Sequence, residues 1–491
     1  MGRMQLQTGA VLDGFLIGEK IHQGGMAEIW EVTKAGIDVP LVMKIPLILD
    51  GDDPTMIVGF EQEMMILPRL TGPHVPRCYG CGDFSAQPYL VMEKIAGESL
   101  LSRFKQAPIP LEEVIDLGAR IATALCSLHK QDVIHLDLKP SNIMLRPLTG
   151  DPTAPGGEAV FIDFGLSRHL RLPDLLAEEF RVPMGTAPYI APEQVLKLRE
   201  EPRSDIFALG VLLYTLATGQ RPFGNPEHKT KALLRRLHEQ PVPPRMLRKD
   251  MPGFLQEIIL RCLEVKPERR YPTAQQLAFD LSHPDHVALT ERATRKPVGW
   301  LRNFLAGRFA NSADAPLSRI ESYRHATTAP IIMVAVDLSP EGAPLREQVQ
   351  SLTAMLLEAK PLARLACVNV LKTARLGIDT MTEEDGTSTH VKRLVELKNW
   401  AAPMRLPPER VTYHVLEAPD AAEILLSFAR NNHVDHLIVG ARGSGGVRRY
   451  LGSVSTAIVA EATCSVTVAR VPSAQQEEET MQESVLPAPT P

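Results

Sequence analysis

The sequence predicts a multidomain protein in which an α+β unit is followed by an α/β unit. Residues 10–94 alternate or cluster β-branched residues between turn signals, and residues 98–282 have mainly helical periodicity. From 330 to 470 strand-like and helix-like segments alternate, which predicts parallel βαβ units. A chain of 491 residues is also too long for one ordinary core, since domains average roughly 150 residues.

Shifts in composition set the predicted domain boundaries. The first unit has a strand-rich lobe at about 14–94, interrupted by a helical pattern at about 54–70, and a helical lobe at about 98–282. Polar, proline-containing stretches follow each unit. The predicted order is an N-terminal extension (1–13), the α+β unit (14–282), a linker (283–328), the α/β unit (329–471) and a disordered acidic tail (472–491).

Charge and hydropathy narrow the partners and the location. The formal net charge is −5 and basic residues are interspersed with acidic ones, so nothing favours a nucleic-acid partner. The longest apolar stretch, residues 206–219, is shorter than the ~20 residues that a membrane-spanning helix needs. The N-terminal residues lack the apolar region of a secretory signal. We therefore expect a cytoplasmic protein without a membrane span.

The six cysteines are too scattered for a disulfide framework. Cys78 and Cys81 have the spacing of half a zinc site, but no second Cys or His pair lies at a matching distance in the sequence. We expect these two residues in a hairpin turn of small residues instead.

The first unit contains the parts of a phosphoryl-transfer site, which must position phosphates and neutralise their charge. The segment "IHQGGMAEIW" places Gly24 and Gly25 in a loop between two strands, where backbone N–H groups can cover phosphates. Ile21 and Ile29 flank the loop and could cover an adenine. Only part of the usual glycine pattern is present, because Ala27 and His22 occupy two of its positions.

A lysine on the next strand is needed to hold the α- and β-phosphates, and Lys44 follows three apolar residues in "LVMK". Its ammonium group needs a counter-ion from the following helix. Glu63 in "FEQEMMILPRL" is the favoured carboxylate, and Glu61 is its competitor.

The loop "HLDLKPSN" supplies the remaining chemistry. Asp137 can accept the proton of a substrate hydroxyl, and Lys139 can neutralise the transferring phosphoryl group. Asn142 and, in "FIDFGLS", Asp163 provide the oxygen ligands that Mg²⁺ prefers, with Mn²⁺ as an alternative ion. Each residue alone could be an ordinary polar loop residue, but all of them in this order predict catalysis.

Residues 14–282 resemble the eukaryotic-type (Hanks-type) serine/threonine protein kinases of bacteria. The resemblance rests on the motifs above and on "GTAPYIAPE", "SDIFALGVLLYTLATGQRPF" and "CLEVKPERRYPTAQQL". It implies a bilobal fold with a β-rich N-lobe and a helical C-lobe, ATP as cosubstrate, and Ser/Thr hydroxyls of proteins, the kinase itself included, as acceptors.

The same resemblance implies further site residues. Four residues would line the adenine and ribose site. Met92 would be the gatekeeper, Glu93 and Ile95 would offer hinge backbone groups to the adenine, and Glu98 would lie near the ribose. Thr186, together with Lys139, matches the serine/threonine branch. Glu193 would form a buried ion pair with Arg270, and Asp205 would brace the backbone of the catalytic loop.

Leu136 departs from the family pattern, because arginine usually precedes the catalytic aspartate and clamps a phosphate on the activation segment. Residues 168–185 contain no Ser, Thr or Tyr, so the phosphate acceptor is missing together with its receptor. We therefore interpret the chain as a non-RD kinase that holds this segment by apolar packing, Leu136 included, without a phosphate. A buried leucine contributes roughly 1.5–3 kcal/mol.

Residues 329–471 resemble the universal stress protein family, which has a doubly wound parallel sheet and some members of which bind ATP. Glycines follow a strand in "VGARGSGGVRRYLGSVS", and "GS" precedes a helix, which suits phosphate at a helix N-terminus. The resemblance places Asp337 near the adenine of a second ATP, with Gly440, Gly443, Gly452 and Ser453 around its phosphates. A domain that forms a homodimer without nucleotide is the alternative.

Two other functions compete with an active kinase regulated or localised by its C-terminal domain. His22, Ala27 and Leu136 would also suit a non-catalytic nucleotide-binding scaffold. A stress sensor that uses the kinase as its reporter is a further alternative. The presence of the general base and both metal ligands favours catalysis, because a module that only binds nucleotide has no need of them.

Overall fold

The structure is a computed structural model of two compact units, one within residues 4–323 and the other within 324–491. It describes residues 6–25, 27–47, 54–147, 157–224, 233–295, 329–373, 388–441 and 452–470. Each unit is considered by itself below.

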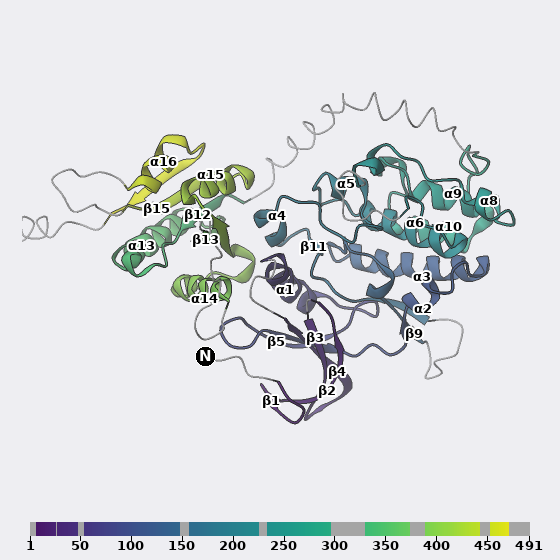
Figure 1. Ribbon diagram of the computed structural model, residues 1–491, viewed down its shortest axis with the longest axis horizontal. Helices are drawn as coiled ribbons and strands as arrows, with labels where there is room; N and C mark the ends of the chain where they lie inside the picture. Colours follow the sequence, from purple (N-terminus) through teal and green to yellow (C-terminus); the bar gives the residue numbers. More distant parts are fainter. Residues whose placement is uncertain are drawn as a thin grey trace, which may run out of the picture. The chain divides into compact units, whose positions relative to one another are not determined.

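The first unit begins with a six-stranded antiparallel sheet in the order β1-β2-β3-β4-β6-β5 (Figure 1). Its strands are β1 (Val11–Leu12), β2 (Phe15–Gln23), β3 (Ala27–Lys34), β4 (Ile37–Pro46), β5 (Cys78–Gly82) and β6 (Tyr89–Glu93). Alternate side chains of β2, β3 and β4 point into one core, where Phe15, Trp30 and Met43 are buried. Strand β1 pairs with β2, so the sheet already begins within the predicted N-terminal extension.

Helix α1 (Pro54–Ile66) and the short 3-10 helix η1 (Leu67–Arg69) fill the predicted helical stretch between the strands. The expected hairpin turn at Cys78 and Cys81 is wrong, because both residues lie in β5. A bulge between Cys78 and Gly80 adapts this edge strand to β6. All six cysteines are free thiols.

The C-lobe is mainly helical, as predicted, with short strand pairs around the catalytic loop. Its strands are β7 (Glu98–Ser99), β8 (Val133–Ile134), β9 (Ile143–Pro147), β10 (Gly157–Phe161) and β11 (Arg168–His169). Its α-helices are α2 (Leu101–Phe104), α3 (Leu111–His129), α4 (Leu175–Glu179), α5 (Pro192–Val195), α6 (Arg203–Thr218), α8 (Pro244–Leu247), α9 (Gly253–Cys262) and α10 (Ala274–Ser282). Its 3-10 helices are η2 (Pro140–Asn142), η3 (Arg235–Leu237), η4 (Pro267–Arg269) and η5 (Pro284–His286).

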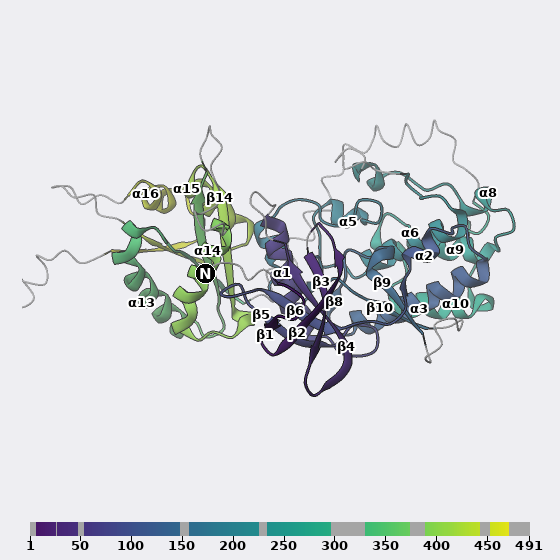
Figure 2. The ribbon, with the colours of Figure 1, turned by 60° about the horizontal axis from the view of Figure 1, so that its bottom comes forward.

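Helix α3 is the axis of the C-lobe and lies side by side with α10 (Figures 1 and 2). Its apolar face is continuous, because Leu117, Ile121 and Leu125 recur at helical spacing and are all buried. After its polar first turn, helix α6 is buried on all sides, which explains its long apolar sequence. None of the helices in the described ranges is long and apolar enough to cross a bilayer.

The structure differs from the sequence prediction just after α10, where residues assigned to the linker pack against the kinase-like unit. Ala293 is buried, and its backbone N–H donates to Glu257 Oε2 of α9 at 3.0 Å. Arg292 forms ion pairs with Glu257 and Glu264. The exact linker boundaries stay a prediction, because residues 296–328 lie outside the described residues.

The second unit is a five-stranded parallel sheet in the order β14-β13-β12-β15-β16. Its strands are β12 (Ile331–Ala335), β13 (Arg364–Lys372), β14 (Val411–Ala418), β15 (His436–Gly440) and β16 (Ser465–Ala469). Its helical segments are η7 (Pro340–Gly342), α13 (Ala343–Ala359), α14 (Thr389–Ala401), η8 (Ala402–Met404), η9 (Pro408–Arg410), α15 (Ala421–Asn431) and α16 (Ser453–Glu461).

The connections of this sheet reverse direction between β12 and β15. Helices α13 and α14 cover one face and α15 and α16 the other (Figures 1 and 2). The predicted doubly wound α/β fold is therefore confirmed. The carboxyl ends of β12 and β15 form the point of reversal, where folds of this kind bind their ligands.

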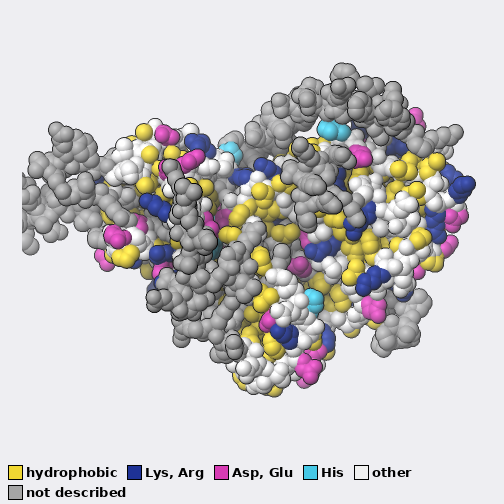
Figure 3. All heavy atoms as spheres, in the orientation of Figure 1, with side chains coloured by type: hydrophobic (Ala, Val, Ile, Leu, Met, Phe, Trp, Pro, Cys, Tyr) yellow, Lys and Arg dark blue, Asp and Glu magenta, His cyan; other side chains and the backbone are white. Residues whose placement is uncertain are grey.

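Lys and Arg side chains are interspersed with Asp and Glu on the face of the molecule drawn in Figure 3. The predicted acidic tail (472–491) and Gly443 lie outside the described residues.

Candidate active site

The catalytic loop between β8 and η2 has a backbone that needs external support. Leu136 has a φ of 61°, in the left-handed region, which costs an L-residue roughly 1–2 kcal/mol. The buried carboxylate of Asp205, on α6, accepts the backbone N–H groups of His135 and Leu136, each at 2.9 Å. Gln194 Nε2 donates to the carbonyl of Leu136 at 2.8 Å. Asp205 thus holds the loop in a conformation that local propensity alone does not favour.

The environment of Asp205 keeps it ionised. Burial alone would raise the pKa of this carboxyl, but the hydrogen bond and charge of His129 and the His135 contacts outweigh burial and lower it below its usual value. The His129 Nε2 to Asp205 Oδ2 distance is 2.9 Å.

Asp137 lies at the centre of the loop, where it contacts three of the other predicted residues. Its Oδ1 accepts both the backbone N–H of Thr186, at 2.8 Å, and the Thr186 hydroxyl, at 2.6 Å. Its Oδ2 accepts from Lys139 Nζ at 2.7 Å, and Asn142 Nδ2 donates to the Asp137 carbonyl at 3.1 Å. The structure therefore brings these four polar side chains together.

Lys44, on β4, joins the sheet to α1 and to the segment after β10. Its Nζ lies 2.6 Å from Glu63 Oε2 and 3.0 Å from Asp163 Oδ1. Burial would lower the pKa of Lys44, but the two carboxylates outweigh burial and raise it, so the ammonium stays charged. Burial would raise the pKa of the Asp163 carboxyl. The charge and hydrogen bond of Lys44 outweigh burial, so this pKa lies below its usual value.

Glu63 also reaches the backbone beyond Asp163, since its Oε1 accepts the Phe164 N–H at 3.2 Å. The Phe164 ring is fully buried and packs against His135 of the catalytic loop, with ring centroids 5.4 Å apart. Helix α1, the segment after β10 and the catalytic loop therefore form one connected assembly.

The glycine loop closes through a hydrogen bond from the Gly24 N–H to the Ala27 carbonyl at 3.0 Å. A Cβ placed on Gly25 would meet no atom within 4 Å, so space lies open beside this backbone. Ile29 is directly opposite Lys44 in the sheet register and is half-buried. Ile21 is 45% exposed.

The predicted adenine-site residues follow one another along the connection between the lobes. Met92 is buried opposite Val42 in the sheet. Glu93 pairs with Arg146 at 2.9 Å, so its side chain is held by the C-lobe strand β9. The next two are less enclosed: Ile95 is half-buried, and Glu98 is exposed in β7.

Glu193 and Arg270 form a buried two-pronged ion pair, with N–O distances of 2.6 and 2.7 Å. Arg270 also donates to the carbonyls of Glu264, Arg203 and Val265. Because every hydrogen-bonding group of this pair is used, its desolvation is compensated. The pair fixes α5, and with it the chain that carries Thr186, to the C-lobe.

The sequence analysis missed several residues that support the site. Gln194 holds the Leu136 carbonyl, His129 holds the Asp205 carboxylate, and Gln62 holds the backbone of the activation segment at Leu175. Gln62 and Gln194 are buried polar side chains. A buried Gln in the middle of an apolar helix is a weak sequence signal, because its partners lie far along the chain.

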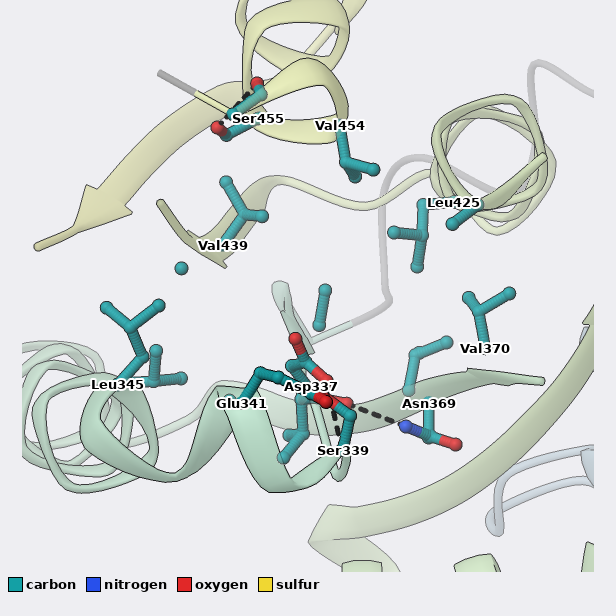
Figure 4. A pocket seen from close by; sticks show the side chains of 18 of the residues that line it. Asp337, Ser339, Glu341, Leu345, Asn369, Val370, Leu425, Val439, Val454 and Ser455 are labelled. Carbon is teal, nitrogen blue, oxygen red and sulfur yellow. Dashed lines mark hydrogen bonds between the residues drawn. The ribbon is translucent and has the colours of Figure 1, made fainter. Parts of the chain in front are cut away.

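The second unit has a cavity of about 540 Å³ at the point where the sheet order reverses (Figure 4). Asp337, Gly440, Gly452 and Ser453 line it, as the sequence analysis expected of a common site. Asn369 also lines it and is buried, and its Oδ1 has no hydrogen-bond partner among the described residues. Apolar side chains such as Leu345, Val439 and Val454 surround these polar groups (Figure 4).

Comparison with known families agrees with this geometry. Residues 15–281 match the family described as "Protein kinase domain". The chain belongs to the protein kinase family. Residues 329–470 match the universal stress protein family, so the kinase domain is joined to a universal stress protein domain.

Curated relatives are bacterial serine/threonine kinases. A probable serine/threonine-protein kinase of Clostridium acetobutylicum is 30% identical over 277 residues, which are 56% of this chain and 40% of the relative. The kinase PknB of Mycobacterium leprae is 28% identical over 274 residues, 55% of this chain and 42% of the relative. The chain thus spans about two fifths of the length of the curated relatives it matches.

Among solved structures, the PknI kinase domain of Mycobacterium tuberculosis is 22% identical to this kinase and covers 56% of this chain and 98% of its own, with a TM-score of 0.43.

The kinase family implies the use of ATP and Mg²⁺. Asn142 and Asp163 offer an amide and a carboxylate oxygen, which are ligands of the kind that Mg²⁺ prefers. Among the described residues no group of three or more His, Cys, Asp or Glu side chains could hold a metal ion.

Replacing Asp205 with Asn tests the support of the kinase catalytic loop. Asp205→Asn should lower the free energy of unfolding by roughly 1.5–3 kcal/mol at pH 7, because hydrogen bonds to a buried charge are lost. The folded-state pKa of Asp205 is depressed, so its contribution is complete above the unfolded pKa of about 3.9 and is lost as pH falls through the lower folded pKa.

Denaturant unfolding of both proteins between pH 7 and pH 2 measures this difference. Asp132→Asn is the control, since Asp132 pairs with the exposed Arg171 at the surface and should shift stability by about 0.5 kcal/mol or less. A difference for Asp205→Asn that stays constant down to pH 2 would contradict the assignment.

Proposed function

We propose that this chain is an active serine/threonine protein kinase that transfers the γ-phosphoryl group of ATP to protein hydroxyls, its own included. The observation that carries the proposal is the double contact of Lys44 with Glu63 and Asp163. A kinase needs the pair between this lysine and the helix glutamate, and the aspartate that holds Mg²⁺, in place at the same time.

The roles of the site residues follow from their contacts. Asp137 would accept the proton of the substrate hydroxyl, and Thr186, now on its Oδ1, marks the side from which that hydroxyl approaches. Lys139, 2.7 Å from Asp137, would neutralise the phosphoryl group during transfer. When bound, Mg²⁺ on Asn142 and Asp163 supplies charge neutralisation of the phosphate oxygens.

The nucleotide would lie between the glycine loop and the connection between the lobes. Ile21 and Ile29 would cover the adenine, Glu93 and Ile95 would offer backbone groups to it behind the gatekeeper Met92, and Glu98 would lie near the ribose. The open space beside Gly25 supports this, because phosphates can approach the backbone there without meeting a side chain.

The alternative of a non-catalytic scaffold is less well supported. A scaffold needs neither a hydroxyl contact on Asp137 nor a charged Lys139 beside it. The sequence departures at His22 and Ala27 affect a loop that still closes by the Gly24 hydrogen bond. The role of a stress sensor, the regulation or localisation by the C-terminal domain, the cytoplasmic location and the domain boundaries stay predictions.

A second ATP site in the universal stress protein domain is favoured by one specific observation. Asn369 lines the cavity, and the Oδ1 of its buried side chain has no hydrogen-bond partner among the described residues. An unpaired buried acceptor is unfavourable unless a ligand donates to it, as the amino group of adenine could. Asp337 would lie near the same base, and Gly440, Gly452 and Ser453 near the phosphates at the start of α16. A homodimer without nucleotide is the alternative use of this domain.

Replacing the proposed general base tests the catalytic assignment. Asp137→Asn should lower the rate of phosphate transfer by about a hundredfold or more, because the amide cannot accept the hydroxyl proton. The measurement is transfer of labelled γ-phosphate from ATP and Mg²⁺ to a generic protein substrate and to the kinase itself. Asp132→Asn should keep its activity, and equal transfer by wild type and Asp137→Asn would overturn the proposal.

Calorimetric titration of the full chain with ATP tests the second site. The wild type should bind two ATP molecules per chain, and Asn369→Leu should bind one, because the cavity loses its free acceptor. Lys44→Met provides the complementary variant, in which the kinase site is weakened and the site in the second unit is kept. One ATP per chain in the wild type, abolished by Lys44→Met, would refute the second site.

A further inference from the structure

The activation segment contains an anion that no catalytic role uses. Asp174 is only 9% exposed and lies between two buried arginines, Arg168 of the same segment and Arg199 beyond it. Arg199 Nε lies 2.8 Å from its Oδ2, and Arg168 Nε lies 3.6 Å from the same oxygen. Its Oδ1 accepts the Ala177 N–H at 3.2 Å and so caps α4.

Besides its ion pair with Asp174, Arg199 contacts both ends of the activation segment directly. Its Nη2 donates to the Leu166 carbonyl at 3.0 Å, near the start of the segment. Its Nη1 contacts the Met184 sulfur at 3.7 Å, two residues before Thr186. Arg168 donates two further hydrogen bonds, to the carbonyls of His169 and Leu172. Loss of Asp174 would remove the ion-pair partner of the buried Arg199 and leave Arg168 with only the charges of Glu200 and Glu178 nearby, which is unfavourable.

The segment held by Asp174 is in turn attached to α1. Gln62 of α1 accepts the Leu175 N–H at 3.1 Å and donates to the Ser167 carbonyl at 3.3 Å. Leu175 and Leu176 pack against Val58 of the same helix. Because α1 also carries Glu63, the position of the activation segment bears directly on the Lys44 ion pair.

The apolar packing expected from the sequence is therefore only part of the support. Leu175, Leu176 and Val58 are the buried members of the apolar cluster at the segment, and Leu136 is not among the residues described in it, although it is buried. Ser167 is an unsuitable phosphate acceptor, because it is fully buried and donates to the His135 carbonyl.

We propose that the Asp174 carboxylate is a permanent counter-ion that positions the activation segment, and through it α1, in place of a phosphate. The inference rests on the proposed kinase function and deepens its regulation. Residues 168–185 carry no hydroxyl group, so the negative charge between Arg168 and Arg199 is encoded in the sequence and needs no second kinase. Asp174 is a positioning residue, since it acts through α4 and α1 and touches no substrate.

The test compares four full-length proteins in steady-state kinetics: wild type, Asp174→Asn, Asp174→Ser, and the serine variant made with phosphoserine at that position. The two uncharged variants should lose kcat by about tenfold, the size expected for uncoupling residues in contact. Phosphoserine should restore most of that loss, because it returns an anion to the two arginines. Phosphatase treatment should leave wild type unchanged and inactivate the phosphoserine protein.

Asp132→Asn is the matched control, because it also removes a carboxylate that pairs with an arginine of the segment, the exposed Arg171. This surface ion pair contributes little, so the variant should keep its kcat. An unchanged kcat in Asp174→Asn, or an equally low kcat with and without the phosphate at position 174, would overturn the inference. Kinetics are measured at a temperature at which all the variants remain folded, so that a loss of kcat reports positioning and not unfolding.

A second measurement keeps this inference separate from the proposed function. If wild type transfers no phosphate at all, the kinase proposal fails. Hydrogen exchange then tests independently whether Asp174 positions the activation segment. Amides of residues 163–186 and of α1 should lose protection in Asp174→Asn and keep it in Asp132→Asn. Equal protection in all three proteins would show that Asp174 does not position the segment.

Discussion

The contact of Lys44 with two carboxylates is the interaction on which the kinase site depends. It joins a strand, a helix and a loop that are separated by 19 and 119 residues along the chain. Glu63 is buried and the Lys44 side chain is only 16% exposed, so each stabilises the charge of the other, whereas the Asp163 side chain keeps 42% of its surface exposed. A shift of α1 or of β4 would therefore leave the buried Glu63 without its counter-charge, and a shift of the loop would remove Asp163 from the lysine.

Buried carboxylates hold irregular backbone throughout the C-lobe. Asp205 satisfies the N–H groups of the catalytic loop, Glu193 fixes α5 through Arg270, and Asp174 gathers the activation segment. Asp205 and Asp174 accept backbone N–H groups where the chain is irregular, and Glu193 acts through the Arg270 side chain. The departure at Leu136 fits this plan, because the counter-charge of the activation segment lies within the segment itself.

The universal stress protein domain forms its cavity through the order of its strands. Its cavity lies where the strand order reverses, at the carboxyl ends of β12 and β15. The backbone after β12 is held there by two arginines: Arg346 donates to the carbonyls of Asp337 and Ser339, and Arg393 donates to that of Leu338. Asn369 lines this cavity, and its buried Oδ1 has no hydrogen-bond partner among the described residues, so a bound donor would satisfy it.

The sequence by itself determined the two fold classes, since periodicity and strand–helix alternation are local properties of the chain. It also identified Lys44, Glu63, Asp137, Asn142 and Asp163 as candidates, because their motifs have a fixed spacing. Only the tertiary structure decided that the Cys78 region is a strand, that residues near Ala293 pack on the kinase domain, and that Asp174 meets Arg168 and Arg199. Those outcomes depend on burial and on partners that are distant in the chain, and neither carries a local sequence signal.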